Sequence, residues 1–188
     1  MKNMPIVCVI ALLLIAVSGC TRLKSAMIAS KSSTQITDEQ MEALLGALET
    51  QDTESILTLF APNALNEANN METTVDLLYS YYQGNYRTYD NWDAANSETT
   101  KENDYLRVEY YGTYDVVTDM DAYRFAFHYV AADSADEGNV GINSIYVIKM
   151  VDDTDPRYAY RGDGRYTPGI QIGVPNSIPN EIGSSETE

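Results

Sequence analysis

The stretch YLRVEYYGTYDVVTDMDAYRFAFHYV, residues 105 to 130, decides the fold class because its apolar and polar residues alternate. A period of two residues is typical of a β-strand with one buried face. The pattern predicts a long strand over 105–118, a tight connection over 119–121 and a second strand from Tyr123. Gly112 interrupts the first strand, where we expect a bend or a bulge. The alternating apolar residues of the first strand are Leu106, Val108, Tyr110, Tyr114 and Val116.

Upstream of Gly84 the apolar residues follow a helical period instead. Met41, Leu44, Leu45 and Leu48 have the i, i+3, i+4, i+7 spacing of one helix face. Thr37 and Gln40 form a capping-box pattern that predicts the start of this helix. A second short helix is expected after Asp52, ended by Pro62. A third helix is expected to begin at Asn69 or Asn70 and to end before Gly84.

Two further strands complete the expected sheet. Residues 140–150 predict a strand with Ile142, Tyr146, Ile148 and Met150 on one face, and residues 86–100 predict a less clearly patterned one. Helices followed by a run of strands indicate an α+β protein rather than alternating βαβ units. The expected fold is therefore a layer of N-terminal helices packed on a curved antiparallel sheet.

This order of elements resembles the nuclear transport factor two-like, cystatin-like cone. More narrowly, the segments 41–65, 113–133 and 139–150 resemble an uncharacterised family of bacterial lipoproteins built on that cone. The resemblance covers about residues 37 to 155. It implies a fold and a location at a membrane, and it implies no activity because the family has none assigned.

The N-terminus has the layout of a secretory signal peptide. Lys2 precedes the apolar run 6–17, which is too short to span a bilayer as a helix. The residues Val17-Ser18-Gly19-Cys20 resemble the lipobox of bacterial lipoproteins. That resemblance implies cleavage after residues 1–19, lipidation of Cys20 and anchoring at the extracytoplasmic face of a membrane.

The rest of the chain divides into three expected parts. Residues 20–36 are polar and Ser-rich and read as a flexible tether, and residues 37–155 form the α+β domain. Residues 156–188 are rich in Gly, Pro and Asp and read as a loop-rich extension with a disordered end. Cys8 leaves with the signal peptide and Cys20 carries the lipid, so disulfides, thiolate zinc sites and cysteine nucleophiles are excluded.

The formal net charge of −16 limits the classes of molecule that the protein is expected to bind. Such a surface repels nucleic acid, so we expect no nucleic-acid partner. Attraction of a cationic partner or of calcium remains an alternative to simple solubility. The acidic loops 133–137 and 152–155 lack the spacing of a calcium-binding loop, and we expect no metal site in them.

The sequence contains no catalytic constellation that we recognise. His128 is the only histidine, and the strand pattern places it opposite the Tyr123–Tyr129 ring face, pointing outward beside Arg124. No serine lies in a Gly-flanked nucleophile elbow. We therefore assign no catalytic residue and expect no cofactor.

Fifteen tyrosines, all after residue 78, are the most informative side chains. A phenol ring suits partly hydrated pockets and interfaces, because it has an apolar ring and a polar hydroxyl. The β-propensity of tyrosine alone also explains its presence in strands. Tyr110, Tyr114 and Tyr146 are the candidate binding residues of a cavity at the mouth of the cone. The alternative use of the tyrosines is a dimer face on the outer sheet.

We expect a membrane-anchored lipoprotein with a non-catalytic domain that binds a small molecule, a peptide or a partner protein. One alternative is a small cone-fold enzyme of the isomerase or dehydratase type that uses Asp and Tyr side chains in the cavity. Another is a homodimeric accessory module that pairs through the outer sheet.

Overall fold

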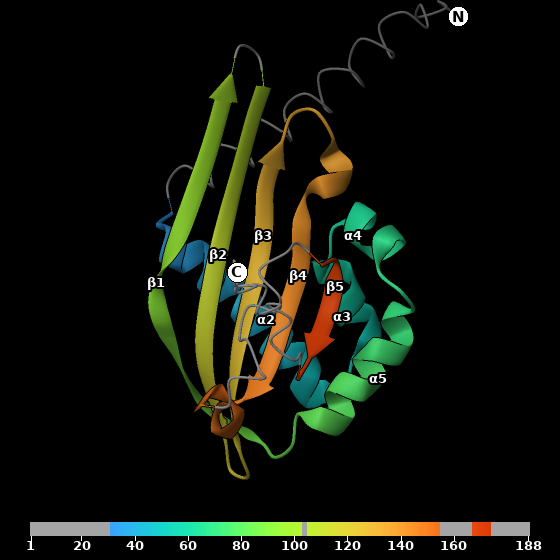
Figure 1. Ribbon diagram of the computed structural model, residues 1–188, viewed down its shortest axis with the longest axis vertical. Helices are drawn as coiled ribbons and strands as arrows, with labels where there is room; N and C mark the ends of the chain where they lie inside the picture. The colour runs from blue at the N-terminus through green and yellow to red at the C-terminus, as the bar shows by residue number, and fades with distance from the viewer. Residues whose placement is uncertain (1–30, 103–104, 155–166, 174–188) are drawn as a thin grey trace, which may run out of the picture.

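Helices precede strands in the computed structural model, which describes residues 31–102, 105–154 and 167–173 (Figure 1). The predicted signal peptide and Cys20 lie outside these described residues. The helices are α2 (Ser33–Thr50), α3 (Thr53–Leu59), α4 (Pro62–Glu67) and α5 (Met71–Tyr81). None of the described helices is long and apolar enough to cross a membrane.

The strands form one mixed, open sheet in the order β1-β2-β3-β4-β5. They are β1 (Tyr86–Glu102), β2 (Tyr105–Thr118), β3 (Ala122–Asp133), β4 (Gly141–Lys149) and β5 (Gly169–Ile172), with short 3₁₀ turns η1 (Glu137–Asn139) and η2 (Met150–Thr154). The α+β class is confirmed. The expectation of a purely antiparallel sheet is wrong, because β5 pairs parallel to β4 from within the segment that we expected to be loop-rich.

Helix α2 begins earlier than the sequence pattern predicted. Ser32 caps it: its Oγ accepts a hydrogen bond from the Gln35 backbone N–H at 3.1 Å, and the Gln35 side-chain oxygen accepts one from the Ser32 N–H at 2.9 Å. The predicted capping box at Thr37 is therefore wrong, and residues 33–36 belong to the helix rather than to the tether. The first turn is held because Ile36 and Thr37 are buried.

Pro62 starts a helix instead of ending one. Helix α3 is capped by Asp52 as predicted, with the carboxylate accepting a hydrogen bond from the Ser55 N–H at 3.0 Å. Proline is tolerated in the first turn of a helix, where its missing N–H has no intrahelical partner to lose. Pro62 accordingly occupies the first turn of α4, a helix that the sequence analysis did not anticipate.

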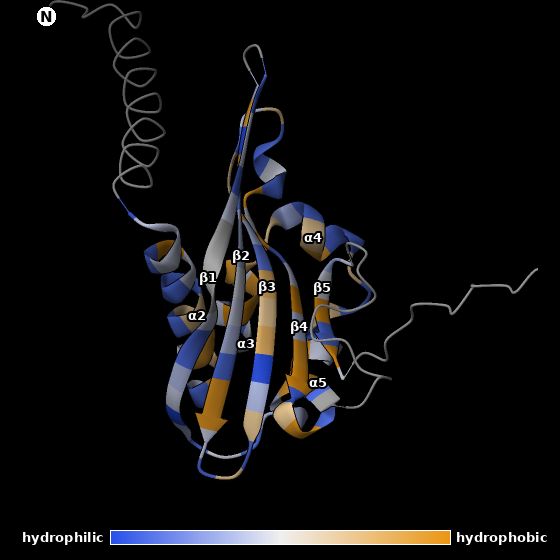
Figure 2. Cartoon of the chain, turned by 60° about the vertical axis from the view of Figure 1, so that its left-hand side comes forward, coloured by the Kyte–Doolittle hydropathy of each residue, from blue (hydrophilic) through white to orange (hydrophobic). Residues whose placement is uncertain are grey.

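The apolar core lies between the helices and one face of the sheet. In Figure 1, α2 and α3 lie behind the strands, and α4 and α5 lie beside β5. Figure 2 shows α2 with apolar residues toward the strands and polar residues away from them. Among the fully buried core side chains are Met41, Leu44, Ile56, Leu78, Tyr114, Phe125, Ile145 and Val147. We call the opposite face of the sheet, away from this core, the outer face.

Two irregularities in strand pairing shape the outer face. The β2–β3 register shifts between Val108 and Glu109, which leaves Ala131 as the extra residue of β3. The β3–β4 register shifts between His128 and Tyr129, which leaves Asn143 as the extra residue of β4. A bulge re-aims the side chains beside it. Ile142 and Ile145 therefore both pack in the core while Tyr146 lies on the outer face, and the prediction that Ile142 and Tyr146 share a face is wrong.

Gly112 marks a close approach of rings rather than a bulge. It pairs with Phe127 in regular register. A Cβ at this position would lie 2.8 Å from carbon atoms of both Phe127 and Tyr114. The glycine lets these two rings stack with their centroids 5.7 Å apart and their planes 6° from parallel.

Candidate functional site

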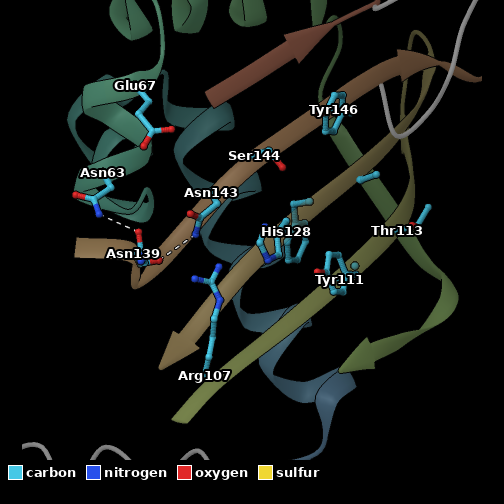
Figure 3. Close-up of a pocket in the computed structure, with 13 residues that line it drawn as sticks. Asn63, Glu67, Arg107, Tyr111, Thr113, His128, Asn139, Asn143, Ser144 and Tyr146 are labelled. Atoms are coloured by element: carbon cyan, nitrogen blue, oxygen red, sulfur yellow. Dashed lines mark hydrogen bonds between the residues drawn. The ribbon is translucent and has the colours of Figure 1, made fainter. Parts of the chain in front are cut away.

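A cavity of about 610 Å³ lies on the outer face of the sheet (Figure 3). Strands β2, β3 and β4 form its floor, and helix α4 contributes one wall through Asn63 and Glu67. The floor presents Tyr111 from β2, His128 from β3 and Tyr146 from β4. Polar side chains and rings thus converge from three consecutive strands and from α4, which is well separated from them in the sequence.

Gly141 places α4 against the sheet. Its φ of +132° suits glycine, and a Cβ there would lie 2.6 Å from the backbone N of Ala61. Across this tight contact the Ala61 N–H donates to the Ile142 carbonyl at 2.8 Å. The connection between α3 and α4 is therefore pinned to the start of β4, which brings Asn63 and Glu67 to the cavity.

An amide network joins α4 to the connection between β3 and β4. The Asn63 side-chain nitrogen donates to Asn139 Oδ1 and to Asp136 Oδ2, both at 2.8 Å. The Asn139 side-chain nitrogen donates in turn to Asp133 Oδ2 at 3.0 Å, and Asn143 donates to the Asn139 carbonyl at 3.0 Å. Two of these contacts are drawn in Figure 3. The network fixes the polar wall before any ligand arrives.

Arg107 continues the network across the sheet. Its Nη1 donates to Asp133 Oδ2 at 2.9 Å, and its Nε donates to Glu109 Oε1. Burial acts to raise the pKa of Asp133, but hydrogen bonds from Asn139 and from backbone N–H groups outweigh it, and the pKa lies below the ordinary value. The single guanidinium is thus shared between two ionised carboxylates.

His128, on the floor of the cavity, forms a close pair with Glu109 beside it. His128 Nε2 lies 2.6 Å from Glu109 Oε2, and the imidazole stacks on the Tyr111 ring at 4.8 Å with the planes 8° apart. Burial lowers the pKa of His128 below its ordinary value, against the opposing pull of Glu109. Burial acts to raise the pKa of Glu109, but hydrogen bonds from His128 and Arg107 hold it below the ordinary value.

These directions fix the protonation of the pair at neutral pH. The imidazole is neutral and the carboxylate is ionised, so the Nε2–H of His128 donates to Glu109. A carboxylate that fixes the tautomer of a buried imidazole also orients the ring. The pair can therefore hold a ring in place for binding, and the same arrangement serves general acid–base chemistry in enzymes.

The structure separates the three predicted binding tyrosines. Tyr146 lines the cavity. Tyr110 packs with Ile36 and Ala131 away from it. Tyr114 is buried in the core, with its hydroxyl 2.8 Å from Thr37 Oγ1. The cavity described above lies on the outer face, and of the three predicted tyrosines Tyr146 lines it.

Sequence reasoning missed Tyr111 and Asn63, which line the cavity, and Glu109, which pairs with the lining residue His128. A signal for part of this set was present. If the two strands are paired residue by residue outward from the tight turn after Thr118, Tyr111 lies opposite His128. The observed register has this pair. Asn63 carried no such signal because its position depends on α4, which was not anticipated.

The acidic loops have structural roles within the described chain. Asp153 accepts a hydrogen bond from Arg124 Nη1 at 2.5 Å, and Asp133 is buried in the network above. Asp155 lies outside the described residues. Within the described ranges, no group of three or more His, Cys, Asp or Glu side chains is arranged to hold a metal ion.

Comparison with known proteins identifies a family. No curated protein matches the chain. Residues 43–150 match the family described as a domain of unknown function (DUF5104). The matched span runs from α2 through β4 and contains the cavity residues named above. Because the match covers more than half of the chain, the protein belongs to the DUF5104 family.

Proposed function

We propose that this protein is a lipoprotein held at the extracytoplasmic face of a membrane, and that its domain binds a small molecule in the outer-face cavity without catalysing a reaction. The observation that carries the binding proposal is the cavity itself. Its volume of about 610 Å³ lies in the range of small-molecule sites, and rings and fixed polar groups converge on it.

The rigidity of the wall supports this function. The links from Asn63 through Asn139 and Asp133 to Arg107 are all made between protein groups. A ligand that enters such a wall does not have to order it, so less binding free energy is lost.

The binding proposal is tested with the full-length protein and a small-molecule extract of the host cell envelope. Molecules retained by the protein are identified by mass spectrometry. Ala126→Leu adds bulk inside the cavity, and Ala43→Leu adds the same bulk on the exposed side of α2. We expect retention by the wild type and by Ala43→Leu and its loss in Ala126→Leu. Equal retention by both variants, or none by the wild type, contradicts the proposal.

The anchor has its own test. The apolar run followed by Val17-Ser18-Gly19-Cys20 supports lipidation of Cys20. Two acyl chains hold a protein stably at a membrane, whereas one does so only marginally. Labelled palmitate should enter the wild type and Cys8→Ser in the native host but not Cys20→Ser. Labelling of Cys20→Ser at the wild-type level argues against the anchor.

We also propose that the helices and the sheet form a cone of the nuclear transport factor two-like, cystatin-like type. Four helices before a meander of long strands support this, as does the packing of α2 against β1 and β2. An experimental structure tests it by superposition on such cones. A sheet that curves away from α2 rather than around it counts against the cone.

The His128–Glu109 pair favours a second candidate function, an enzyme that uses acid–base chemistry at the same cavity. The retained molecule is incubated with the protein and followed by mass spectrometry and NMR. Isomerisation or loss of water with the wild type, absent with His128→Gln, supports the enzyme. An unchanged molecule supports binding alone.

A further inference from the structure

Carboxylates outnumber cationic groups among the described residues that line the outer-face cavity or pair directly with its lining. Arg107 is matched by Glu109 and Asp133, with which it shares hydrogen bonds. Glu67 adds a further carboxylate to the wall, and His128 is neutral at pH 7 because burial lowers its pKa. An anion that approached Arg107 would therefore also meet the two carboxylates that already hold it.

Glu67 stands apart from the other carboxylates. It lies near the end of α4, is exposed, and has no hydrogen bond or ion pair with another described residue. Figure 3 shows its carboxylate directed from α4 toward the cavity. Glu109 and Asp133, by contrast, are each engaged by several donors. Glu67 is thus the carboxylate of this site that can accept new hydrogen bonds.

The amide donors of the wall are largely used within the protein. Both amide hydrogens of Asn63 go to Asp136 and Asn139, and Asn139 donates to Asp133. A ligand rich in acceptors therefore finds few donors on this side, whereas a ligand that donates hydrogen bonds finds Glu67.

Tyr111 supplies a surface that attracts cations. One face of its ring stacks on His128, and the residue remains 37% exposed at the cavity. A phenol ring attracts an ammonium or guanidinium group over its face through its quadrupole, by about 0.5–1 kcal/mol at exposed sites.

We propose that the outer-face cavity takes an organic cation, a small molecule with at least one ammonium group. The ammonium group binds Glu67, and an adjoining part of the molecule lies over Tyr111. The formal net charge of −16 adds a long-range attraction that raises the local concentration of such cations. This inference rests on the proposed binding function and names the chemical class of its ligand.

Three probes of one length but different end groups test the ligand class. The full-length protein is titrated with hexamethylenediamine, hexamethylene glycol and adipate while the backbone and ring NMR signals of cavity residues are followed. We expect the diamine to bind in the cavity about ten-fold or more tightly than the glycol or adipate. Its affinity should fall as salt is added.

Matched variants separate the cavity from general attraction to an acidic surface. Glu67→Gln should weaken diamine binding about three-fold, the effect typical of one exposed ion pair. Tyr111→Leu should weaken it by a similar factor. Glu54→Gln makes the same charge change on the exposed side of α3, away from the cavity, and should leave the affinity unchanged.

The outcomes distinguish this inference from the function on which it rests. Cavity binding of the glycol or adipate as tight as that of the diamine leaves the binding function standing and overturns the cation class. Equal weakening by Glu67→Gln and Glu54→Gln also overturns it, because the attraction is then a property of the whole surface. Cavity signals that none of the three probes moves overturn the cation class, whereas the binding function is decided by retention from the envelope extract.

Discussion

Tyr111 and Tyr114 are three residues apart on β2 and lie on opposite faces of the sheet. Tyr114 is 0% exposed, packs against Phe127 and meets Thr37 of α2 through its hydroxyl. Tyr111 is 37% exposed, stacks on His128 and reaches Glu109 with its hydroxyl at 3.2 Å. One residue type is thus used on one face to hold the helices and on the other to line a cavity.

The contrast between the faces lies in what fixes the side chains. On the helix side, apolar burial does so, at about 25 cal/mol for each Å² removed from water. On the outer face, hydrogen bonds between charged and amide groups do so, and their net contribution to stability is smaller. Mutations on the helix side should therefore change stability first, and mutations on the outer face should change binding first.

The largest effect is expected from Phe125→Ala. Phe125 is fully buried on the helix side of β3, and the cavity left by its ring should lower the free energy of unfolding by about 3–5 kcal/mol. Tyr111→Ala, on the outer face, should lower it by about 1 kcal/mol or less because the ring is already partly hydrated. Urea unfolding measures both, and losses of equal size would break the contrast between the two faces.

The next largest effect is expected from Gly141→Ala, which should lower the free energy of unfolding by about 2 kcal/mol. The new side chain would adopt a φ that suits glycine and would press on the Ala61 backbone. NMR signals of Asn63 and His128 should also shift as α4 moves away from the sheet. Gly46→Ala is the matched control, because the added Cβ meets open space on the exposed side of α2. This substitution should raise the free energy of unfolding by up to about 1 kcal/mol. If Gly141→Ala and Gly46→Ala changed the free energy of unfolding in the same direction, this account would be contradicted.

Tyr114→Phe should have a smaller effect. It removes the hydroxyl that lies 2.8 Å from Thr37 Oγ1 and 2.7 Å from Asp38 Oδ1, and it should cost about 1 kcal/mol by thermal or urea unfolding. Tyr111→Phe removes a hydroxyl from the half-exposed outer face, where water replaces the lost contact, and should cost less. A reversed order would show that the outer network carries more stability than its exposure suggests.

The smallest effect is a pH dependence that belongs to the outer face. The ordinary pKa of histidine is 6.5, and burial lowers that of His128 in the folded protein. Between these two values the unfolded chain binds a proton that the folded protein does not bind, so acidification lowers the free energy of unfolding. The contribution is present above pH 6.5 and is lost as the pH falls through the folded pKa.

The pH dependence is measured by urea unfolding across mildly acidic pH. His128→Gln should flatten the profile in this range, while Phe125→Ala should lower stability at every pH and keep the slope. A His128→Gln profile as steep as that of the wild type would assign the titration to another group.

Local patterns predicted the regular elements well. Strand β2 has the predicted bounds 105–118, and Asp52 caps α3 as expected. Strand β5 escaped prediction because it has four residues, lies in a segment rich in Gly and Pro, and pairs parallel to β4 without a local turn signal. Helix α4 escaped because Pro62 suits a helix start as well as a helix end.

The site was harder to predict because it depends on pairing between strands. Alternation assigns residues to two faces of a strand, but it does not say which face the helices cover at each point. The extra residue Asn143 reverses the alternation in β4, so Tyr146 lies on the outer face while Ile142 lies in the core. The Glu109–His128 pair follows from the β2–β3 register, which makes these two residues diagonal neighbours and which alternation within one strand does not reveal.

The early start of α2 at Ser33 has a consequence for the proposed lipid anchor, because it shortens the chain between Cys20 and the domain. Once Cys20 carries the lipid, as we propose, residues 21–31 are all that separate the anchor from the cap of the helix. Even fully extended, that length of chain reaches only roughly 40 Å. The domain would then stay within that distance of the lipid headgroups. Any cation that it binds would come from the layer of counter-ions at the membrane surface rather than from the bulk solution.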